Sequence, residues 1–412
     1  MALAVTRQID HDFDEMHRRM QWYVDEELLS CCATVVMHGT DVVDVGLFGF
    51  MDVETREPLR LDGIHRIYSN TKLITSVAAM MLHERGLFGL DDPIEKYLPE
   101  FSNMRVLREG ATSLDGTVPA KRSITPRHLL SHTSGLSYGF IEPDSLIDQS
   151  YTAAGLNIFF GDYDEPLSDL CVQLGGFPLV FQPGTEWRYS FATDVVARLV
   201  EVLSGERFDT FLEASIFSPL EMVDTGFHVP PDKHDRFVTM YSGPDLLDHT
   251  KPGLFKADDP ATGRFSQPRE LLIGGGGLVS TLRDYTNFMQ MLIGGGKWHG
   301  HRILSQDTLL LMRTNQLPEG VRVNFPTLSL PGTVFGLGFA IVEHPEPDDP
   351  PGRTGEYFWG GMAGTAAWIA PESNAAGICF TQRMPAAFHP YTYDFARFVY
   401  QSAPDRETNS RT

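Results

Sequence analysis

Segments typical of β-strands lie at both ends of this 412-residue chain, with helical segments between them. Near the start, two apolar stretches rich in β-branched residues, 33–37 and 42–50, are joined by the turn-like His38-Gly39-Thr40-Asp41, which predicts a hairpin. Four further strands are expected after Pro331, at 334–342, 356–359, 365–369 and 377–381. Because strands and helices do not alternate regularly, we expect one antiparallel sheet completed by both termini.

Apolar residues recur at helical spacing in five segments, which we expect to be helices: 9–29, 71–85, 194–203, 281–292 and 390–400. Residues 229–270 are rich in Pro, Asp and Gly and are typical of an irregular excursion that shapes a substrate mouth. The predicted fold is α/β of the α+β type, with the sheet flanked by helices. An α/β domain would span 1–90 and 300–412, and an inserted, mainly helical domain with irregular loops would span 91–299.

The composition excludes some classes of function. The formal net charge is −21 and no basic cluster stands out, so nucleic-acid binding is not expected. No run of about 18 apolar residues occurs, and the segment from Met1 to Arg7 turns polar too early for a signal peptide, so we expect no membrane association. The four cysteines lack metal-type spacing, and Cys31 and Cys32 are adjacent, which favours buried thiols in a reducing, cytoplasmic compartment.

The motif Ser69-Asn70-Thr71-Lys72 stands where an extended segment passes into an expected helix. Positions three apart on a starting helix lie on one face, so Ser69 and Lys72 are within reach of each other. A serine hydroxyl needs a base to become a nucleophile, and a lysine desolvated in a pocket has a lowered pKa and can serve as that base. The helix N-terminus adds N–H groups that suit an oxyanion. The alternative is a helix cap at Ser69 with a solvated Lys72, since Ser-x-x-Lys also arises by chance.

Two later segments carry candidate partners for this pair. Tyr189 lies just before the helix expected over 194–203, and a tyrosine near cationic groups can relay protons; the alternative is a buried, hydrogen-bonded tyrosine. Trp359-Gly360-Gly361-Met362 ends an expected strand, where glycines let a ligand approach the backbone; the alternative is a hairpin turn behind a core tryptophan. His299-Gly300-His301 is the only close histidine pair and lacks partners at ligand spacing, so we expect neither a metal nor a cofactor.

These three motifs, in this order, resemble those of the serine β-lactamase and penicillin-binding protein superfamily, namely Ser-x-x-Lys, Tyr-x-Asn and Lys-Thr-Gly. The chain looks most like the family VIII carboxylesterases, relatives of class C β-lactamases that carry Tyr-Ser-x and Trp-Gly-Gly in the second and third places. The resemblance runs from about residue 12 to 402, nearly the whole chain. Surrounding segments match as well: Leu129 to Leu136, Gln182-Pro183-Gly184 and Tyr189 to Asp194.

The resemblance implies a β-lactamase/transpeptidase-like fold and a serine carboxylesterase that hydrolyses small or short-chain carboxylic esters. Ser69 would be the acylated nucleophile, while Lys72 and Tyr189 would share the general-base and general-acid roles. The backbone N–H groups of Ser69 and Met362 would form the oxyanion hole. A small-molecule ester is therefore the expected partner.

The resemblance also assigns residues to the substrate pocket. Trp359, Gly360 and Gly361 would line the acyl or leaving-group side, and Tyr138 would face the pocket from the helical domain. Two positions depart from the lactamase pattern, because Trp359 replaces a lysine and Phe191 replaces an asparagine. Losing a charged and an amide partner makes the pocket more apolar, which suits neutral esters. Weak β-lactam hydrolysis is still compatible with the same acylation machinery.

Other activities stay open at this point. An acyltransferase, a β-lactamase or a D-peptidase would use the same motifs, and a non-hydrolytic binding scaffold would keep the fold without turnover. Gly135-Leu136-Ser137-Tyr138-Gly139 also fits the Gly-x-Ser-x-Gly pattern of α/β-hydrolases, with His389 filling the histidine position. That motif needs a strand before the serine and a helix after it, whereas 127–132 is expected to be helical. The sequence does not fix the natural substrate or the oligomeric state.

Overall fold

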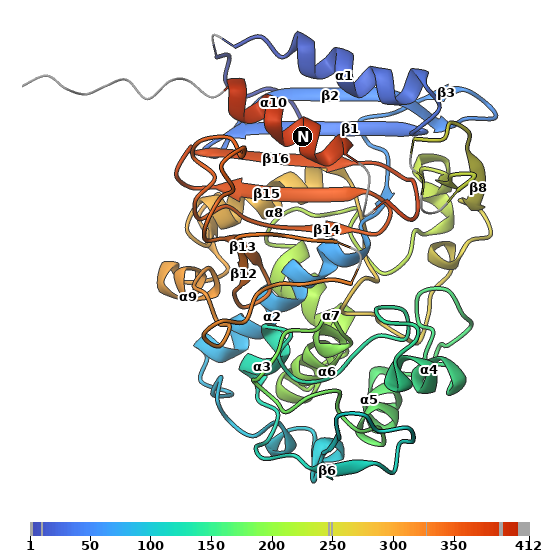
Figure 1. Ribbon diagram of the computed structural model, residues 1–412. Coiled ribbons are helices and arrows are strands. Elements are labelled where there is room, and N and C mark those ends of the chain that lie inside the picture. The colour runs from blue at the N-terminus through green and yellow to red at the C-terminus, as the bar shows by residue number, and fades with distance from the viewer. Residues whose placement is uncertain are drawn as a thin grey trace, which may run out of the picture.

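The computed structural model describes residues 3–9, 11–245, 248, 250–326, 328–386 and 390–402. Its main element is an eight-stranded antiparallel sheet (Figure 1). In spatial order its strands are β12 (Thr333–Phe335), β13 (Ala340–Val342), β14 (Tyr357–Gly361), β15 (Thr365–Ala370), β16 (Ala375–Phe380), β1 (Cys31–His38), β2 (Asp41–Asp52) and β3 (Glu57–Pro58). The pairing of β1 with β16 joins the two ends of the chain, as predicted.

The predicted hairpin is the pair β1–β2. Its turn contains Gly39, whose φ of +59° is a conformation that glycine adopts without steric cost, and the Gly39 N–H donates to the carbonyl of Asn374. A register shift between Val36 and Met37 bends the pair. Strand β1 is buried along nearly its whole length because helices cover both faces of the sheet there, which explains its continuous apolar sequence.

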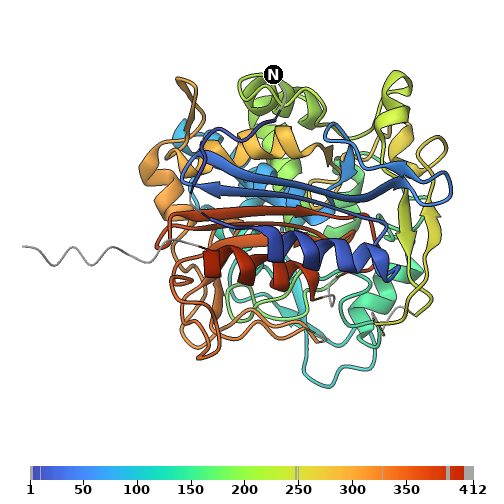
Figure 2. The ribbon, with the colours of Figure 1, turned by 90° about the horizontal axis from the view of Figure 1, so that it is seen from above.

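Two helices cover the outer face of the sheet. Figure 2 shows α1 (Asp14–Asp25) and α10 (Tyr391–Ser402) lying side by side over the strands. Met16, Met20 and Phe395 from these helices form a core cluster against the sheet. Helix α1 is shorter than the expected 9–29, because the N–H groups of Leu28 and Leu29 turn back to the carbonyl of residue 23 and the chain leaves the helix there.

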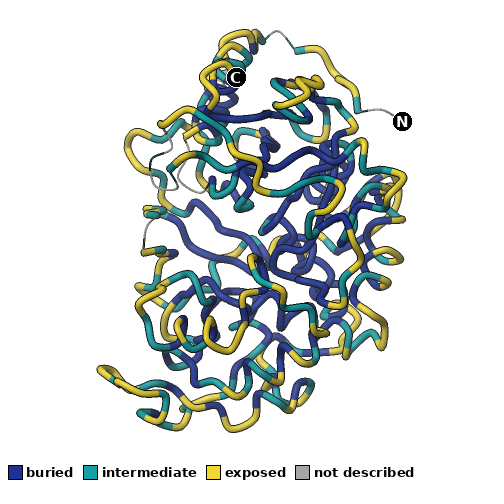
Figure 3. The backbone as a smooth tube through the Cα atoms, turned by 90° about the vertical axis from the view of Figure 1, so that its right-hand side faces the viewer, coloured by how far each residue is buried: buried dark blue, intermediate teal, exposed yellow. Residues whose placement is uncertain are grey.

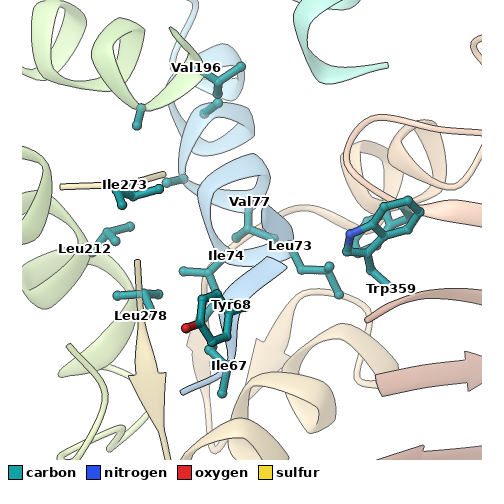
Figure 4. Close-up of a cluster of buried hydrophobic side chains, with 14 of the residues drawn as sticks. Ile67, Tyr68, Leu73, Ile74, Val77, Val196, Leu212, Ile273, Leu278 and Trp359 are labelled. Atoms are coloured by element: carbon teal, nitrogen blue, oxygen red, sulfur yellow. The ribbon is translucent and has the colours of Figure 1, made fainter. Parts of the chain in front are cut away.

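The inner face of the sheet is covered by α8 (Leu282–Ile293), and α2 (Thr71–Glu84) runs between the sheet and the helical part of the molecule (Figure 1). In α2 every residue from Thr71 to Leu82 is buried, so the helix has no solvated face over that stretch. Figure 3 shows burial continuing from the sheet into the helical part. Figure 4 shows Leu73 and Val77 of α2 within the cluster of apolar side chains that includes Trp359 of β14.

The other described helices lie around α2 or on the surface. They are α3 (Pro126–Leu130), α4 (Leu146–Ala153), α5 (Leu167–Gly175), α6 (Ala192–Ser204), α7 (Phe208–Leu212) and α9 (Gln306–Met312). Single turns are η1 (Tyr68–Asn70), η2 (Ile94–Lys96), η3 (Pro99–Phe101), η4 (Glu213–Phe217), η5 (Pro231–Arg236) and η6 (Arg264–Ser266). Four small sheets pair β4 (His65–Arg66) with β9 (Val279–Ser280), β5 (Arg105–Leu107) with β6 (Thr117–Pro119), β7 (Met240–Ser242) with β8 (Phe255–Asp258), and β10 (Lys297–Trp298) with β11 (His301–Arg302).

The single strand predicted over 334–342 is wrong, because the segment forms two strands, β12 and β13, joined by a tight turn. Gly338 in this turn has a φ of +95°, and a Cβ there would lie 2.2 Å from Ser76 Oγ of α2, so only glycine fits. The segment 229–270 is mostly irregular, as expected, but it also contains the small sheet β7–β8. Among the described residues, no helix combines the length and the apolar character that a membrane span requires.

Candidate active site

Ser69 lies in the single turn η1, between the short strand β4 and helix α2. The preceding residue, Tyr68, has a φ of +41°, a left-handed conformation that costs a non-glycine residue steric energy. This bend ends the extended segment and presents Ser69 at the start of α2, where its side chain is partly exposed although its neighbours Tyr68 and Asn70 are buried. A strained backbone conformation persists only where the surrounding structure holds it, so the bend directly before Ser69 is a specific feature of the fold.

Lys72 lies one helical turn after Ser69, and its side chain is buried. Its Nζ is 3.4 Å from Ser69 Oγ and donates a hydrogen bond of 2.5 Å to the carbonyl of Gly275. Burial disfavours the charged ammonium and lowers the pKa of Lys72 to about 7, although the carboxylate of Asp194 opposes this shift. A substantial fraction of neutral amine therefore exists near pH 7, and a neutral amine can accept the proton of Ser69.

Tyr189 precedes α6 and points its hydroxyl at the same place. Trp359 Nε1 donates a hydrogen bond of 3.2 Å to Tyr189 Oη, and the Ser69 side chain is a second hydrogen-bond partner of the tyrosine. Lys72 Nζ lies 4.4 Å from the centre of the Tyr189 ring. Burial raises the pKa of Tyr189 above its usual value, so the residue is a neutral phenol at physiological pH and suits proton donation. The structure therefore brings Ser69, Lys72 and Tyr189 together.

The strand edge predicted to line the site lies against the segment before Ser69. A Cβ on Gly361 would lie 2.3 Å from the carbonyl oxygen of Ile67, and the Thr365 hydroxyl donates to that same carbonyl at 3.0 Å. Glycine at 361 thus allows β14 to approach the chain just before the nucleophile. Gly360 is exposed and Met362 is partly exposed. The oxyanion-hole role of the Met362 N–H stays a prediction.

Two further residues, Asp194 and Gly275, hold Lys72 in the site, and the sequence analysis gave neither a role. The Gly275 N–H donates to Asp194 Oδ1 at 2.9 Å, while the Gly275 carbonyl accepts from Lys72, so the backbone of one residue links both side chains. A Cβ on Gly275 would lie 2.6 Å from Tyr138 Oη, 2.9 Å from Asp194 Oδ2 and 3.1 Å from Lys72 Nζ. Burial raises the pKa of Asp194 to about 6. The sequence offered one signal for Asp194, because it is a carboxylate among the apolar residues of a buried helix.

Tyr138 and Phe191 are both buried and pack edge-to-face with ring centres 4.6 Å apart. The Tyr138 hydroxyl donates to Asp194 Oδ2 at 3.3 Å, and its ring contacts Tyr189. Tyr138 therefore belongs to the cluster around Lys72, whereas Phe191 supports it from the helical part. Their roles toward a substrate stay predictions.

His132 is a further residue beside Tyr189 to which the sequence analysis gave no role. Its ring centre lies 5.0 Å from that of Tyr189, and its Nδ1 lies 3.3 Å from Ser190 Oγ. Burial and the nearby Lys72 lower the pKa of His132 well below its usual value, so the imidazole is neutral. A neutral ring here packs against Tyr189 without adding a second positive charge beside Lys72.

The rival nucleophile Ser137 has a different setting. It is fully buried, donates to Asp148 Oδ1 at 2.5 Å and accepts from Arg188 Nε at 2.7 Å. The helix α3 and a loop precede it, not a strand, so the geometry of an α/β-hydrolase elbow is missing. His389 lies outside the described residues.

Comparison with known proteins identifies the family of the chain. The family model described as Beta-lactamase matches residues 18–401. Esterase EstB of Burkholderia gladioli is 28% identical over 376 residues, covering 89% of this chain and 88% of EstB. Acyltransferase calJ of Penicillium decumbens is 31% identical over 348 residues, covering 80% of this chain and 78% of calJ.

The fold agrees as well. The solved structure of EstCE1, described as a hydrolase with promiscuous acyltransferase activity, matches with a TM-score of 0.77 and 25% identity, covering 93% of this chain and 97% of EstCE1. The predicted β-lactamase/transpeptidase-like fold and the resemblance to family VIII carboxylesterases are thereby confirmed. The chain belongs to the beta-lactamase family, and its relatives within that family support a serine-hydrolase type of enzyme.

Proposed function

We propose that this protein is a serine carboxylesterase that hydrolyses small, neutral carboxylic esters through a covalent acyl-enzyme on Ser69. One observation carries the proposal: the buried Lys72 Nζ lies 3.4 Å from Ser69 Oγ, and its pKa is lowered to about 7. A lysine that serves only as a solvated surface charge would show neither the burial nor the shift.

The acylation step follows from the positions of the three side chains. Neutral Lys72 takes the proton of Ser69 while Oγ forms a bond to the ester carbonyl carbon, and the backbone N–H groups of Ser69 and Met362 stabilise the oxyanion. When the tetrahedral intermediate collapses, the bond to the alcohol oxygen breaks and Tyr189 donates its proton to that oxygen. The Lys72 ammonium then returns a proton to Tyr189. Water attacks the acyl-enzyme in the second half-reaction and releases the acid.

The character of the pocket supports esters over β-lactams. Trp359 occupies the position of the lysine in the lactamase motif, and its indole is hydrogen-bonded to Tyr189. An indole offers no positive charge to the carboxylate of a β-lactam, whereas it provides apolar area for a neutral substrate. Strong β-lactamase or D-peptidase activity is therefore not part of this proposal.

Acyl transfer is the second candidate. The name of calJ and the description of EstCE1 support it, since both include acyltransferase activity. In that reaction an alcohol or amine replaces water as the group that attacks the acyl-enzyme, and the acylation step is unchanged. Product analysis with and without an added alcohol distinguishes the two: hydrolysis gives the acid alone, and transfer gives a new ester.

Intact-protein mass spectrometry after brief exposure to p-nitrophenyl acetate tests the acyl-enzyme. We expect a transient mass gain of one acetyl group on the wild type and none on Ser69→Ala. Lys72→Ala should acylate more slowly by about 10²–10⁴-fold. An adduct that persists in Ser69→Ala would overturn the assignment, with Ser137→Ala as the next variant to compare. A stable adduct without turnover would instead indicate a binding scaffold.

A further inference from the structure

Three phenylalanines form an aromatic surface that rises from the active site to solvent, and we call Phe140, Phe159 and Phe160 the aromatic ramp. Exposure increases along it: Phe159 is 9% exposed, Phe140 is intermediate and Phe160 is 51% exposed. The ring centre of Phe140 lies 6.1 Å from that of Phe159 and 6.1 Å from that of Phe160. Apolar area at the surface, from Phe160 and the half-buried Phe140, therefore continues inward to the buried Phe159.

The inner end of the ramp lies beside the turn that carries the nucleophile. A Cβ on Gly276 would lie 2.6 Å from the ring of Phe159 and 3.6 Å from the carbonyl carbon of Tyr68, the atom bonded to the nitrogen of Ser69. The gap between the Phe159 ring and the start of the Ser69 turn is therefore about the space that a side chain on Gly276 would fill. On its other side Phe159 packs edge-to-face on Tyr138, with ring centres 5.7 Å apart. Tyr138 in turn contacts Lys72 and Tyr189.

The position of Tyr189 decides which part of an ester meets the ramp. The leaving oxygen must lie beside the proton donor, so the alcohol part of the ester departs toward Tyr189 and the aromatic rings that pack on it, Trp359 and Phe325. The acyl part has to extend from Ser69 in another direction. The ramp begins where Phe159 packs on Tyr138, next to Gly276, and so lies beside the turn that carries Ser69.

We infer that the aromatic ramp binds the acyl group of the substrate, which is an uncharged, medium-chain or aromatic acyl group. This inference rests on the proposed esterase or acyltransferase function. Its acyl class follows from the ramp itself, because three benzene rings offer apolar area and no hydrogen-bonding or charged group. An acetyl group is too short to extend from Ser69 over Phe140 and Phe160.

A series of p-nitrophenyl esters tests this inference. Each methylene buried on the ramp is worth about fourfold in kcat/KM. We expect kcat/KM of the wild type to rise by about tenfold or more from the acetate to the hexanoate. Phe160→Ser should lower this hexanoate-to-acetate ratio by about threefold or more, and Phe159→Ala should lower it further. Tyr393→Ser removes an aromatic side chain that is 49% exposed on α10, on the face of the sheet opposite to α2, and should leave the ratio unchanged.

Phe160 is on the surface, so its serine variant keeps the test valid even where Phe159→Ala fails to fold. A ratio that does not change in Phe160→Ser would overturn the inference, as would an effect confined to a series that varies the alcohol at constant acyl group. Failure of the proposed function has a separate signature, because no ester would then label Ser69 in the mass spectrum. Acetylation of Ser69 together with an unchanged ratio would refute the ramp alone.

Discussion

At the scale of single residues, the chemistry depends on a buried cation and a buried anion held by the backbone of one residue, Gly275. The Gly275 carbonyl binds Lys72 and its N–H binds Asp194, so the backbone separates the two charges while keeping both at the site. Burial lowers the pKa of the lysine, and the carboxylate opposes that shift. Asp194 therefore acts as a positioning residue that sets how much neutral amine exists at a given pH.

The rate of acylation should rise with pH as Lys72 loses its proton, with a midpoint near the lowered pKa of about 7. In Asp194→Asn the anion that favours the ammonium is gone, so the pKa of Lys72 falls further and the midpoint moves to lower pH, by about one unit. Stopped-flow release of p-nitrophenol from the acetate ester, recorded from pH 5 to 9, measures the midpoint. A midpoint that stays in place or moves upward would contradict the role given to Asp194.

Gly275→Ala should lower kcat/KM by about 10²-fold, because the new methyl group would press on the groups that position the base. The methyl would lie 2.6 Å from Tyr138 Oη and 3.1 Å from Lys72 Nζ, distances that force one of them to move. Gly226→Ala is the matched control, since the nearest atom to a Cβ there is 3.8 Å away. Equal activity of the two variants, measured with p-nitrophenyl acetate, would show that the close contact has no catalytic consequence.

The residues that the sequence predicted and those it missed differ in how far their partners lie along the chain. Ser69 and Lys72 are three apart on one helix start, so their proximity follows from helix geometry alone. Asp194 and Gly275 meet across 81 residues of sequence, and nothing in the local pattern of either segment indicates the other. Gly274 to Gly277 has the composition of a turn, and only the folded chain shows a carbonyl directed at Lys72.

At the scale of elements, periodicity predicted both ends of the expected helices to within two residues, except for α1. Gly205 ends α6 in the left-handed conformation with a φ of +73°, close to the end predicted at residue 203. The prediction of one strand over 334–342 was wrong because the apolar run continues through a turn. The alternation of side chains along a strand does not show where the chain reverses its direction. The reason for that turn is tertiary, since Gly338 lies against Ser76 of α2.

A charged network joins three elements around the site, and its loss should destabilise the fold. Asp148 of α4 accepts hydrogen bonds from Ser137 and from Arg188, the residue before Tyr189, and all three side chains are buried. Asp148→Asn leaves Arg188 with only the exposed carboxylate of Glu142, 2.8 Å from its Nη1, as a counter-ion, so the free energy of unfolding should fall by about 2–3 kcal/mol, the scale of hydrogen bonds to a charged group. Urea unfolding followed by circular dichroism measures this loss. A loss below about 1 kcal/mol would contradict the prediction.

Ser137→Ala separates the two candidate nucleophiles. Removing this hydroxyl leaves Arg188 Nε without one acceptor, so stability should fall by about 1–3 kcal/mol. Acetylation of Ser69 in the mass spectrum should persist below the unfolding transition, because Ser137 is fully buried and has no access to an ester. Loss of the adduct in a variant that is still folded would favour the α/β-hydrolase interpretation.

At the scale of the whole molecule, the sheet separates a catalytic side from a supporting side. The pairing of β1 with β16 was predictable, since the expected strands lie at the two ends of the chain with helical segments between them. The order of the remaining strands was not, because pairing among similar apolar segments depends on long-range contacts that the local pattern does not specify. The outer helices α1 and α10 form a separate core cluster from the one that contains α2 and Ser69's neighbours.

This separation predicts that a change between α1 and α10 lowers stability without changing catalysis. Asp394 of α10 accepts hydrogen bonds from Arg19 Nε at 2.6 Å and from Tyr23 Oη at 2.7 Å, and so joins the first helix of the chain to the last. Asp394→Ala should lower the free energy of unfolding by about 2 kcal/mol, the scale of hydrogen bonds to a charged group. Glu26→Ala, at an exposed position after α1, is the control and should change neither property.

Kinetic measurements on Asp394→Ala test whether the two faces of the sheet are independent. With p-nitrophenyl acetate at a temperature where Asp394→Ala is fully folded, kcat and KM should equal those of the wild type, because α1 and α10 lie on the face of the sheet opposite to α2. A fall in kcat that parallels the loss of stability would mean that the sheet transmits strain from its outer face to Ser69. Unchanged kinetics with a lower unfolding midpoint would instead establish the terminal helices as a stabilising cover, which can be altered without altering the site.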